Sequence, residues 1–387
     1  GRKKKGLLSN PAIHGKLGMV PAFDWSDPQT RNALLEVFLI PLLVQWWGAW
    51  YPGAEPGGGG YVAQRMLAAK NERHATGAVL FFNAAHYALR QWPWILVGLA
   101  SLAVFPDLAS LRHEFPNVPE SYVKDDLAYP AMLTFLPVGL KGLVMASLIA
   151  AYMSTIATHL NWGSSYVVND FWKRFIRKGA GEKEYVLVGR VTTACLMIGT
   201  ALIAPRTESA MKGFNILIQI GAGTGLISML RWFWWRINPQ VEITGMCVSL
   251  LTAIGFAIYG PEGTPEWVKL VTGVALTTGA WIIVMFLTRP DDPQKLRSFY
   301  KLVKPGGIGW RRVLQEAAAD GDPIEPAPTH VPLAITCILA GSLSIWGALF
   351  AAGYFLYGQY TIATVLTVAT AIASFFLLRT WMRISAD

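Results

Sequence analysis

Nine long apolar runs constrain this chain more than any other feature of its sequence. They cover residues 31–51, 75–105, 131–168, 186–205, 213–235, 241–260, 266–288, 332–357 and 360–382. A helix that crosses a bilayer needs about 20 mostly apolar residues, so each run is long enough to span one. Only 15% of the residues are charged, whereas soluble globular chains carry about 25%. The sequence therefore predicts an all-α polytopic membrane protein with about nine spans.

The net charge of +9 indicates membrane topology rather than a nucleic-acid partner. If all nine runs cross the bilayer, 19 of the 33 Lys and Arg residues lie in segments on one side, and five lie in the later segments on the other. Basic residues collect on the cytoplasmic side. We therefore expect a plasma (inner) membrane protein with a cytoplasmic C-terminus, although the basic N-terminal tail falls on the outer side.

The first run is followed by an irregular segment, PGAEPGGGG at 52–60, which cannot continue a regular helix. Non-helical backbone at membrane depth is tolerated where it lines a cavity, and broken helices form the substrate sites of many secondary transporters. Glu55 would then bind a cation or a polar solute. An ordinary loop with a solvated carboxylate explains the same spacing equally well.

The second run contains polar residues at helical spacing, among them Asn83, His86 and Arg90. Ionisable groups within a span indicate a functional site by default. The alternative is structural: Arg90 caps backbone carbonyls, and His86 is a hydrogen-bonded core histidine, as is His159 in the third run.

The third run contains the segment AAYMSTIATHLN at 150–161. Ala151, Ser154 and Thr155 follow i, i+3, i+4 spacing, which places them on one helical face. Hydroxyl and carbonyl oxygens are hard ligands that suit a small hard cation such as Na⁺. Small and hydroxyl residues also pack helices together in membranes, and on composition alone packing is the favoured interpretation.

Enzyme chemistry finds little support in the sequence. The three cysteines lie in apolar runs without metal-ligand spacing, and no hydrolase, zinc-protease or phosphate-loop motif is present. His86 and His159 have no accompanying nucleophile or metal constellation. We therefore expect the chain not to be an enzyme.

Two segments resemble the sodium:solute symporter family, which includes the sodium/glucose and sodium/proline symporters. These are YVAQRMLAAKNERHATGA at 61–78 and the segment 129–175, which contains the MST motif. The resemblance implies a leucine-transporter-type fold of two inverted five-helix repeats plus additional helices. It also implies that the Ala151 carbonyl and the Ser154 and Thr155 hydroxyls bind Na⁺, which overturns the packing interpretation.

The resemblance also gives a domain organisation. Residues 1–30 would be an extracellular loop-like segment, and 31–235 the second five-helix repeat. Four additional transmembrane helices would follow, two in 236–288 and two in 332–387, separated by a cytoplasmic loop at 289–331. Because the family's other Na⁺ ligands come from a first repeat that is absent here, we expect an N-terminally incomplete transporter whose remaining helices lie upstream or on another chain.

The expected function is sodium-coupled secondary active symport of a small polar solute by alternating access. A sugar, an amino acid, an organic acid and a nucleoside all remain open, because PGAEPGGGG departs from the sugar transporters. The residues expected to line the solute cavity are Gln45, Trp47, Glu55, Asn83 and His86. The alternative is a non-transporting membrane subunit or sensor, built on a symporter scaffold within a larger complex.

Overall fold

A computed structural model describes residues 17–49, 60–206, 209–261, 263–327 and 331–384. These residues form helices joined by turns and loops, and the described part contains no strand beyond one isolated bridge between Ala49 and Ala222. They divide into two compact units, Val97–Gly213 on the one hand and Gly1–Leu96 with Phe214–Asp387 on the other. The helical architecture agrees with the expected all-α class.

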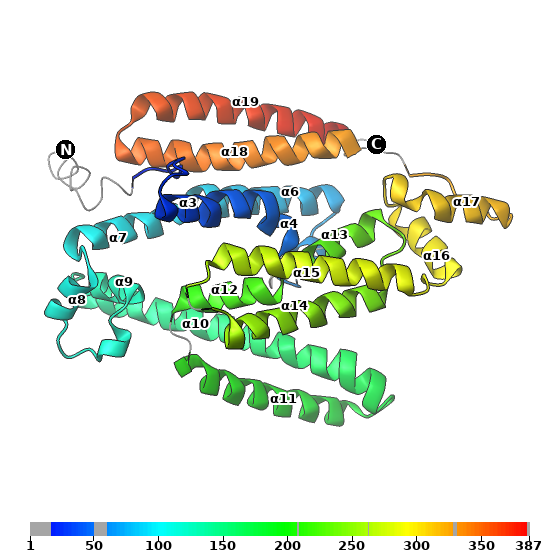
Figure 1. The fold of residues 1–387 in the computed structure, drawn as a ribbon, viewed down its shortest axis with the longest axis horizontal. Helices are drawn as coiled ribbons and strands as arrows, with labels where there is room; N and C mark the ends of the chain where they lie inside the picture. The colour runs from blue at the N-terminus through cyan, green and yellow to red at the C-terminus, as the bar shows by residue number, and fades with distance from the viewer. Residues whose placement is uncertain (1–16, 50–59, 207–208, 262, 328–330, 385–387) are drawn as a thin grey trace. The chain divides into compact units, whose positions relative to one another are not determined.

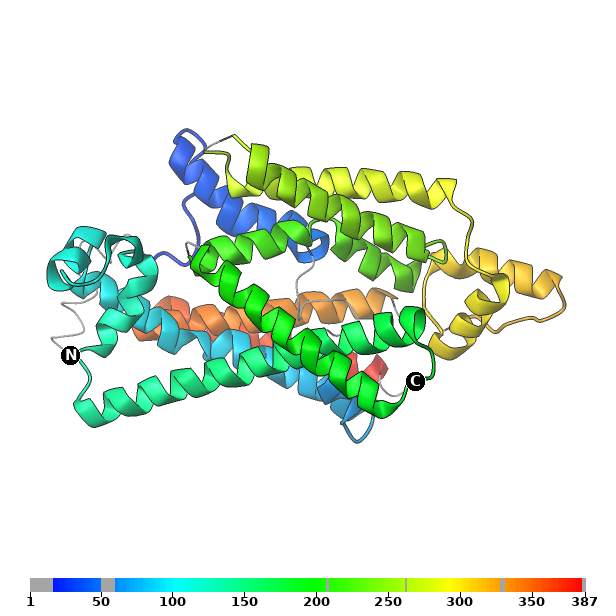
Figure 2. The same cartoon turned by 90° about the horizontal axis from the view of Figure 1, so that it is seen from below.

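The unit Val97–Gly213 is built around two long helices, α10 and α11, which contact each other and cross at an angle (Figure 2). α10 begins directly after Pro137 and continues beyond Ser165 as wider π-helical turns, Tyr166–Ile176. A small cluster of Phe105, Leu111 and Ala131 forms a separate core. The helices of this unit are α8 Leu108–Glu114, α9 Ala128–Leu133, α10 Val138–Ser165 and α11 Glu182–Ile203.

The other unit contains two antiparallel helix pairs, α14 with α15 and α18 with α19 (Figure 1). α7 and α12 each extend across a boundary between the units. The remaining helices are α3 Pro28–Leu34, α4 Trp46–Gly48, α5 Gly60–Leu67, α6 Glu72–Asn83, α7 Gln91–Val104, α12 Ala210–Ile220, α13 Thr224–Phe233, α14 Pro239–Tyr259, α15 Glu266–Leu287, α16 Pro293–Val303, α17 Arg311–Ala319, α18 Val331–Tyr357 and α19 Tyr360–Ile384.

Six helical segments of the described residues are long and apolar enough to cross a membrane. A seventh candidate combines Glu72–Val104 with Leu108–Glu114, which are bent by 75° relative to each other. The first and fifth apolar runs are not among them. The first is helical from Pro28 to Gly48, with π-helical turns between α3 and α4, whereas the fifth is divided into α12 and α13. The expected count of nine spans stays a prediction. The six are Val138–Ile176, Glu182–Ile203, Pro239–Tyr259, Glu266–Leu287, Pro332–Tyr357 and Tyr360–Met382.

The fifth run, expected as one apolar segment over 213–235, is interrupted between α12 and α13. Gly223 has a φ of +84°, which favours glycine. The interruption frees backbone groups that must be paired in an apolar environment. The Ser249 hydroxyl donates to the carbonyl of Ile220, and the Gly223 N–H donates to the carbonyl of Gly48 at 2.5 Å. The broken helix is therefore held by its neighbours.

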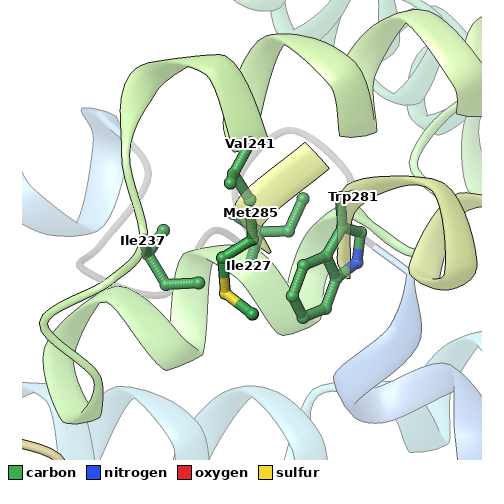
Figure 3. Close-up of a cluster of buried hydrophobic side chains, with 5 residues drawn as sticks. All are labelled: Ile227, Ile237, Val241, Trp281 and Met285. Carbon is green, nitrogen blue, oxygen red and sulfur yellow. The ribbon is translucent and has the colours of Figure 1, made fainter. Parts of the chain in front are cut away.

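A buried hydrophobic cluster joins α13, α14 and α15 (Figure 3). Its members are Ile227, Ile237, Val241, Trp281 and Met285. Trp281 is 1% exposed and Met285 is fully buried, so this cluster is the most completely enclosed core of its unit.

The segment expected as a loop over 289–331 contains two amphipathic helices, α16 and α17. We call its described residues, 289–327, the polar arm. Its apolar residues gather around Trp310, whose indole N–H donates to the carbonyl of Trp232 at 3.0 Å. On the outside of the arm, the Lys301 ammonium donates to the Asp322 carboxylate and holds its pKa below the usual value. Burial of the apolar face explains why this segment is helical.

Candidate sodium and solute sites

The sodium candidates occupy successive turns in the middle of α10. Backbone helicity places Ala151, Ser154 and Thr155 on one face, as their spacing predicts. The Thr155 hydroxyl donates to the carbonyl of Ala151 at 2.9 Å. This bond fixes the Thr155 rotamer and leaves lone pairs of its oxygen available to a cation.

The donor set on α10 fits a small hard cation. Within the described residues, the Ser154 hydroxyl has no hydrogen-bond partner, and Ser154 and Thr155 are both exposed. In the most apolar stretch of the span Val138–Ile176, almost no residue is buried. The Ser154 and Thr155 hydroxyls therefore lie on an open face of α10, next to the Ala151 carbonyl, which accepts the Thr155 hydroxyl in this structure. Three ligands are fewer than the six to eight that a larger hard cation such as Ca²⁺ takes, so further oxygen ligands would have to come from elsewhere.

Asn83 and His86 lie where α6 passes into the π-helical turn Ala84–Leu89. Arg90 donates from its guanidinium to Nδ1 of His86 at 2.8 Å. Because arginine only donates, Nδ1 is the acceptor in this contact, which leaves Nε2 as the ring atom that can donate to a solute. Asn83 donates its amide N–H to the carbonyl of Val79 at 2.8 Å, which leaves its side-chain oxygen as an acceptor. The two side chains can thus offer one donor and one acceptor to a polar solute.

Gln45 and Trp47 lie at the end of the first apolar run, in the turn Pro41–Gln45 and in α4. The Trp47 indole packs against the cluster that contains Ala222 and Val274 and donates to the carbonyl of Leu43 at 2.6 Å. Its N–H therefore already has a partner. Glu55 lies outside the described residues.

The structure brings the sodium candidates together on one helix but leaves the solute candidates in separate places. In the described part of the chain, no hydrogen bond or ring contact joins Gln45 or Trp47 to Asn83 or His86. The sodium candidates belong to the unit Val97–Gly213 and the solute candidates to the other unit. The assignment of both sets stays a prediction.

Sequence reasoning missed a polar cluster at the start of α15. Glu36 accepts a hydrogen bond from the backbone N–H of Glu266 at 3.1 Å, and Gln219 donates to the Glu266 carboxylate at 2.7 Å. Lys269 pairs with the same carboxylate at 2.6 Å. An acid inside the first apolar run, Glu36, was the signal that could have revealed it. The cluster joins the first run, α12 and α15 by polar contacts.

Comparison with known proteins identifies the family. The model of the sodium:solute symporter family matches residues 27–249. The sodium/myo-inositol cotransporter 2 of Oryctolagus cuniculus is 32% identical over 302 residues, which is 70% of this chain and 43% of the relative. The mouse cotransporter of the same name is 32% identical over 208 residues, 50% of this chain and 30% of the relative.

A bacterial relative gives the same result. The sodium/glucose cotransporter of Vibrio parahaemolyticus is 30% identical over 251 residues, which is 60% of this chain and 44% of that protein. The chain thus spans less than half the length of each of these three relatives. The family match extends over more than half of the chain and includes the MST segment of α10. The chain is an integral membrane protein that belongs to the sodium:solute symporter family.

Proposed function

We propose that the chain is part of a sodium-coupled symporter that moves a small polar solute by alternating access. The observation that carries the proposal is the open oxygen face of α10 within a segment that matches the family. On this face the Ala151 carbonyl and the Ser154 and Thr155 hydroxyls would bind Na⁺, the ion that drives transport. The basic residues of the segments after the first run support a cytoplasmic C-terminus in a plasma membrane.

The solute proposal rests on hydrogen-bonding chemistry. The relatives are named for myo-inositol and glucose, both neutral polyhydroxy compounds. His86, held by Arg90, would donate from Nε2 to a solute hydroxyl, and the Asn83 side-chain oxygen would accept from another. A polyol or sugar is therefore the first solute class to test, with Gln45, Trp47 and Glu55 as further candidates for the cavity.

The experiment is uptake of radiolabelled solute by cells that express the complete transporter. Removal of a hydroxyl takes a hard ligand from Na⁺, and one charge-assisted contact amounts to about 1.5–3 kcal/mol. We expect Ser154→Ala and Thr155→Ala each to raise the Na⁺ concentration for half-maximal uptake by about tenfold or more.

Ser147→Ala is the matched control, because Ser147 lies two turns away, or about 10 Å, on α10 and donates only to the carbonyl of Val144. Uptake by this variant should retain its Na⁺ dependence. Unchanged Na⁺ dependence in the Ser154 and Thr155 variants would refute the sodium site. A complete protein that transports no solute in any Na⁺ gradient would instead favour a subunit or sensor.

A further inference from the structure

A cavity of about 520 Å³ lies where α13 ends, α14 begins and the polar arm starts. Its size is that of ordinary ligand pockets, about 300–1,000 Å³. Ile237 of the buried cluster in Figure 3 forms part of its lining, together with Leu296 of α16. None of its residues belongs to the sodium or solute candidates, so any ligand here would be a separate one.

Aromatic rings form a continuous wall of this cavity. Phe299 and Trp310 are stacked with their ring centroids 5.4 Å apart, and Trp232 lies 6.1 Å from Phe299. The indole N–H of Trp310 donates to the backbone carbonyl of Trp232, which fixes the Trp310 ring. The guanidinium of Arg231 lies 5.7 Å from the Trp232 ring centroid, so a ring of this wall already faces a cation. Aromatic faces of this kind bind quaternary and primary ammonium groups.

Four ionisable side chains line the cavity, two of each sign. Arg231 and Glu242 are 3.5 Å apart and partly neutralise each other. Within the described residues, the side chains of Asp291 and Lys295 have no hydrogen bond or ion pair. The cavity therefore presents one unpaired anion and one unpaired cation beside an aromatic wall.

The position of the cavity indicates the source of its ligand. Its lining includes the start of α14 and Asp291, which follows the end of α15, and both helices are long and apolar enough to span a membrane. Arg236, in the connection between α13 and α14, donates to the carbonyls of Met285 and Phe286 in the last turn of α15. These bonds keep that connection, which lines the cavity, level with the end of α15. Spans end where lipid headgroups begin, so the cavity opens at headgroup depth.

We propose that this cavity binds the headgroup of a zwitterionic phospholipid, one that carries a phosphate and an ammonium group. Lys295 takes the phosphate, together with Arg231 of the same lining. Asp291 and the aromatic wall take the ammonium group. The charges of the four ionisable groups sum to zero. An anionic headgroup without an ammonium group would therefore place its negative charge in the same cavity as the Asp291 carboxylate, with no cation to pair with that carboxylate.

The test uses the full 387-residue chain purified in detergent and native mass spectrometry to measure lipid binding. The probes are dihexanoyl-phosphatidylethanolamine and dihexanoyl-phosphatidylglycerol, which differ in the ammonium group. We expect the wild-type chain to bind the first about tenfold more tightly, the equivalent of one charge-assisted contact. Asp291→Asn should abolish that preference, while Lys295→Gln should weaken the binding of both lipids by about tenfold.

Lys301→Gln is the control, because Lys301 lies on the same helix but outside the cavity, paired with Asp322. It should leave both affinities unchanged. Equal binding of the two lipids by the wild-type chain, or unchanged binding by the Asp291 and Lys295 variants, would overturn the proposal. If free O-phosphoethanolamine competes as strongly as the lipid, the cavity takes a soluble zwitterion, and the assignment of its ligand to a lipid would be wrong.

Discussion

Gly223 combines two constraints at the point where the fifth apolar run is broken. Its φ is +84°, and a Cβ there would lie 2.5 Å from Cβ of Thr277. An L-residue in the left-handed region costs about 1–2 kcal/mol, and overpacking adds about 1–3 kcal/mol. We expect Gly223→Ala to lower the free energy of unfolding by at least about 2 kcal/mol, measured by denaturant titration of the chain in mixed micelles.

Gly255→Ala provides the comparison, since Gly255 lies within α14 and a Cβ there meets nothing within 4 Å. Replacement of Gly by Ala in a helix interior raises the free energy of unfolding by about 0.5–1 kcal/mol. Equal stability of the two variants would show that the break between α12 and α13 is not fixed by its glycine. The sequence shows the glycines at 221, 223 and 225, but their apolar flanks predict a continuous span. The partners that stabilise the break, Gly48 and Ser249, are distant in sequence and could not be predicted from it.

At the scale of elements, a close backbone approach is one of the contacts that hold the polar arm. A Cβ at Gly309 would overlap the carbonyl oxygen of Phe233, and the Trp235 N–H donates to the Gly309 carbonyl at 3.5 Å. Backbone cannot move aside as a side chain can, so overpacking should cost about 1–3 kcal/mol. We expect Gly309→Ala to detach the arm and to speed its cleavage by trypsin about tenfold.

Gly306→Ala should leave the cleavage rate unchanged, because a Cβ at Gly306 has open space around it. Cleavage at the same rate in both variants would mean that the arm is held by other contacts than the one at Gly309. The measurement follows the tryptic fragments that arise at Lys and Arg residues of 289–327 by mass spectrometry.

The sequence predicts those elements whose stability is local. The runs at 241–260, 266–288 and 332–357 correspond to α14, α15 and α18 within two residues, because apolar length alone selects a helix in a membrane. The arm was missed because its helices are short, and one of the contacts that hold it is the hydrogen bond from the Trp310 indole to the carbonyl of Trp232, 78 residues away. Spacing alone also placed Ser154 and Thr155 on one face of α10, since helical periodicity is local as well.

At the scale of the whole molecule, the open question is whether α12 and α13 together cross the membrane. Ala210–Phe233 would extend about 36 Å as a helix, enough to span about 30 Å of hydrocarbon, but the break at Gly223 leaves neither piece long enough alone. Between Tyr122 and Leu302, four candidate spans pass the length criterion. If α12–α13 is a fifth, the two residues lie on opposite sides of the membrane.

Cysteine labelling decides the number of crossings. Cys195, Cys247 and Cys337 are first replaced by Ser, and then Tyr122→Cys or Leu302→Cys is introduced, at sites that are 70% and 84% exposed. The sorting of basic residues places 289–331 on the cytoplasmic side. We therefore expect a membrane-impermeant maleimide to label intact cells at position 122, and to label position 302 only after permeabilisation. Labelling of both positions from the same side would mean that α12–α13 enters and leaves the bilayer on one face, and the nine-span topology would be wrong.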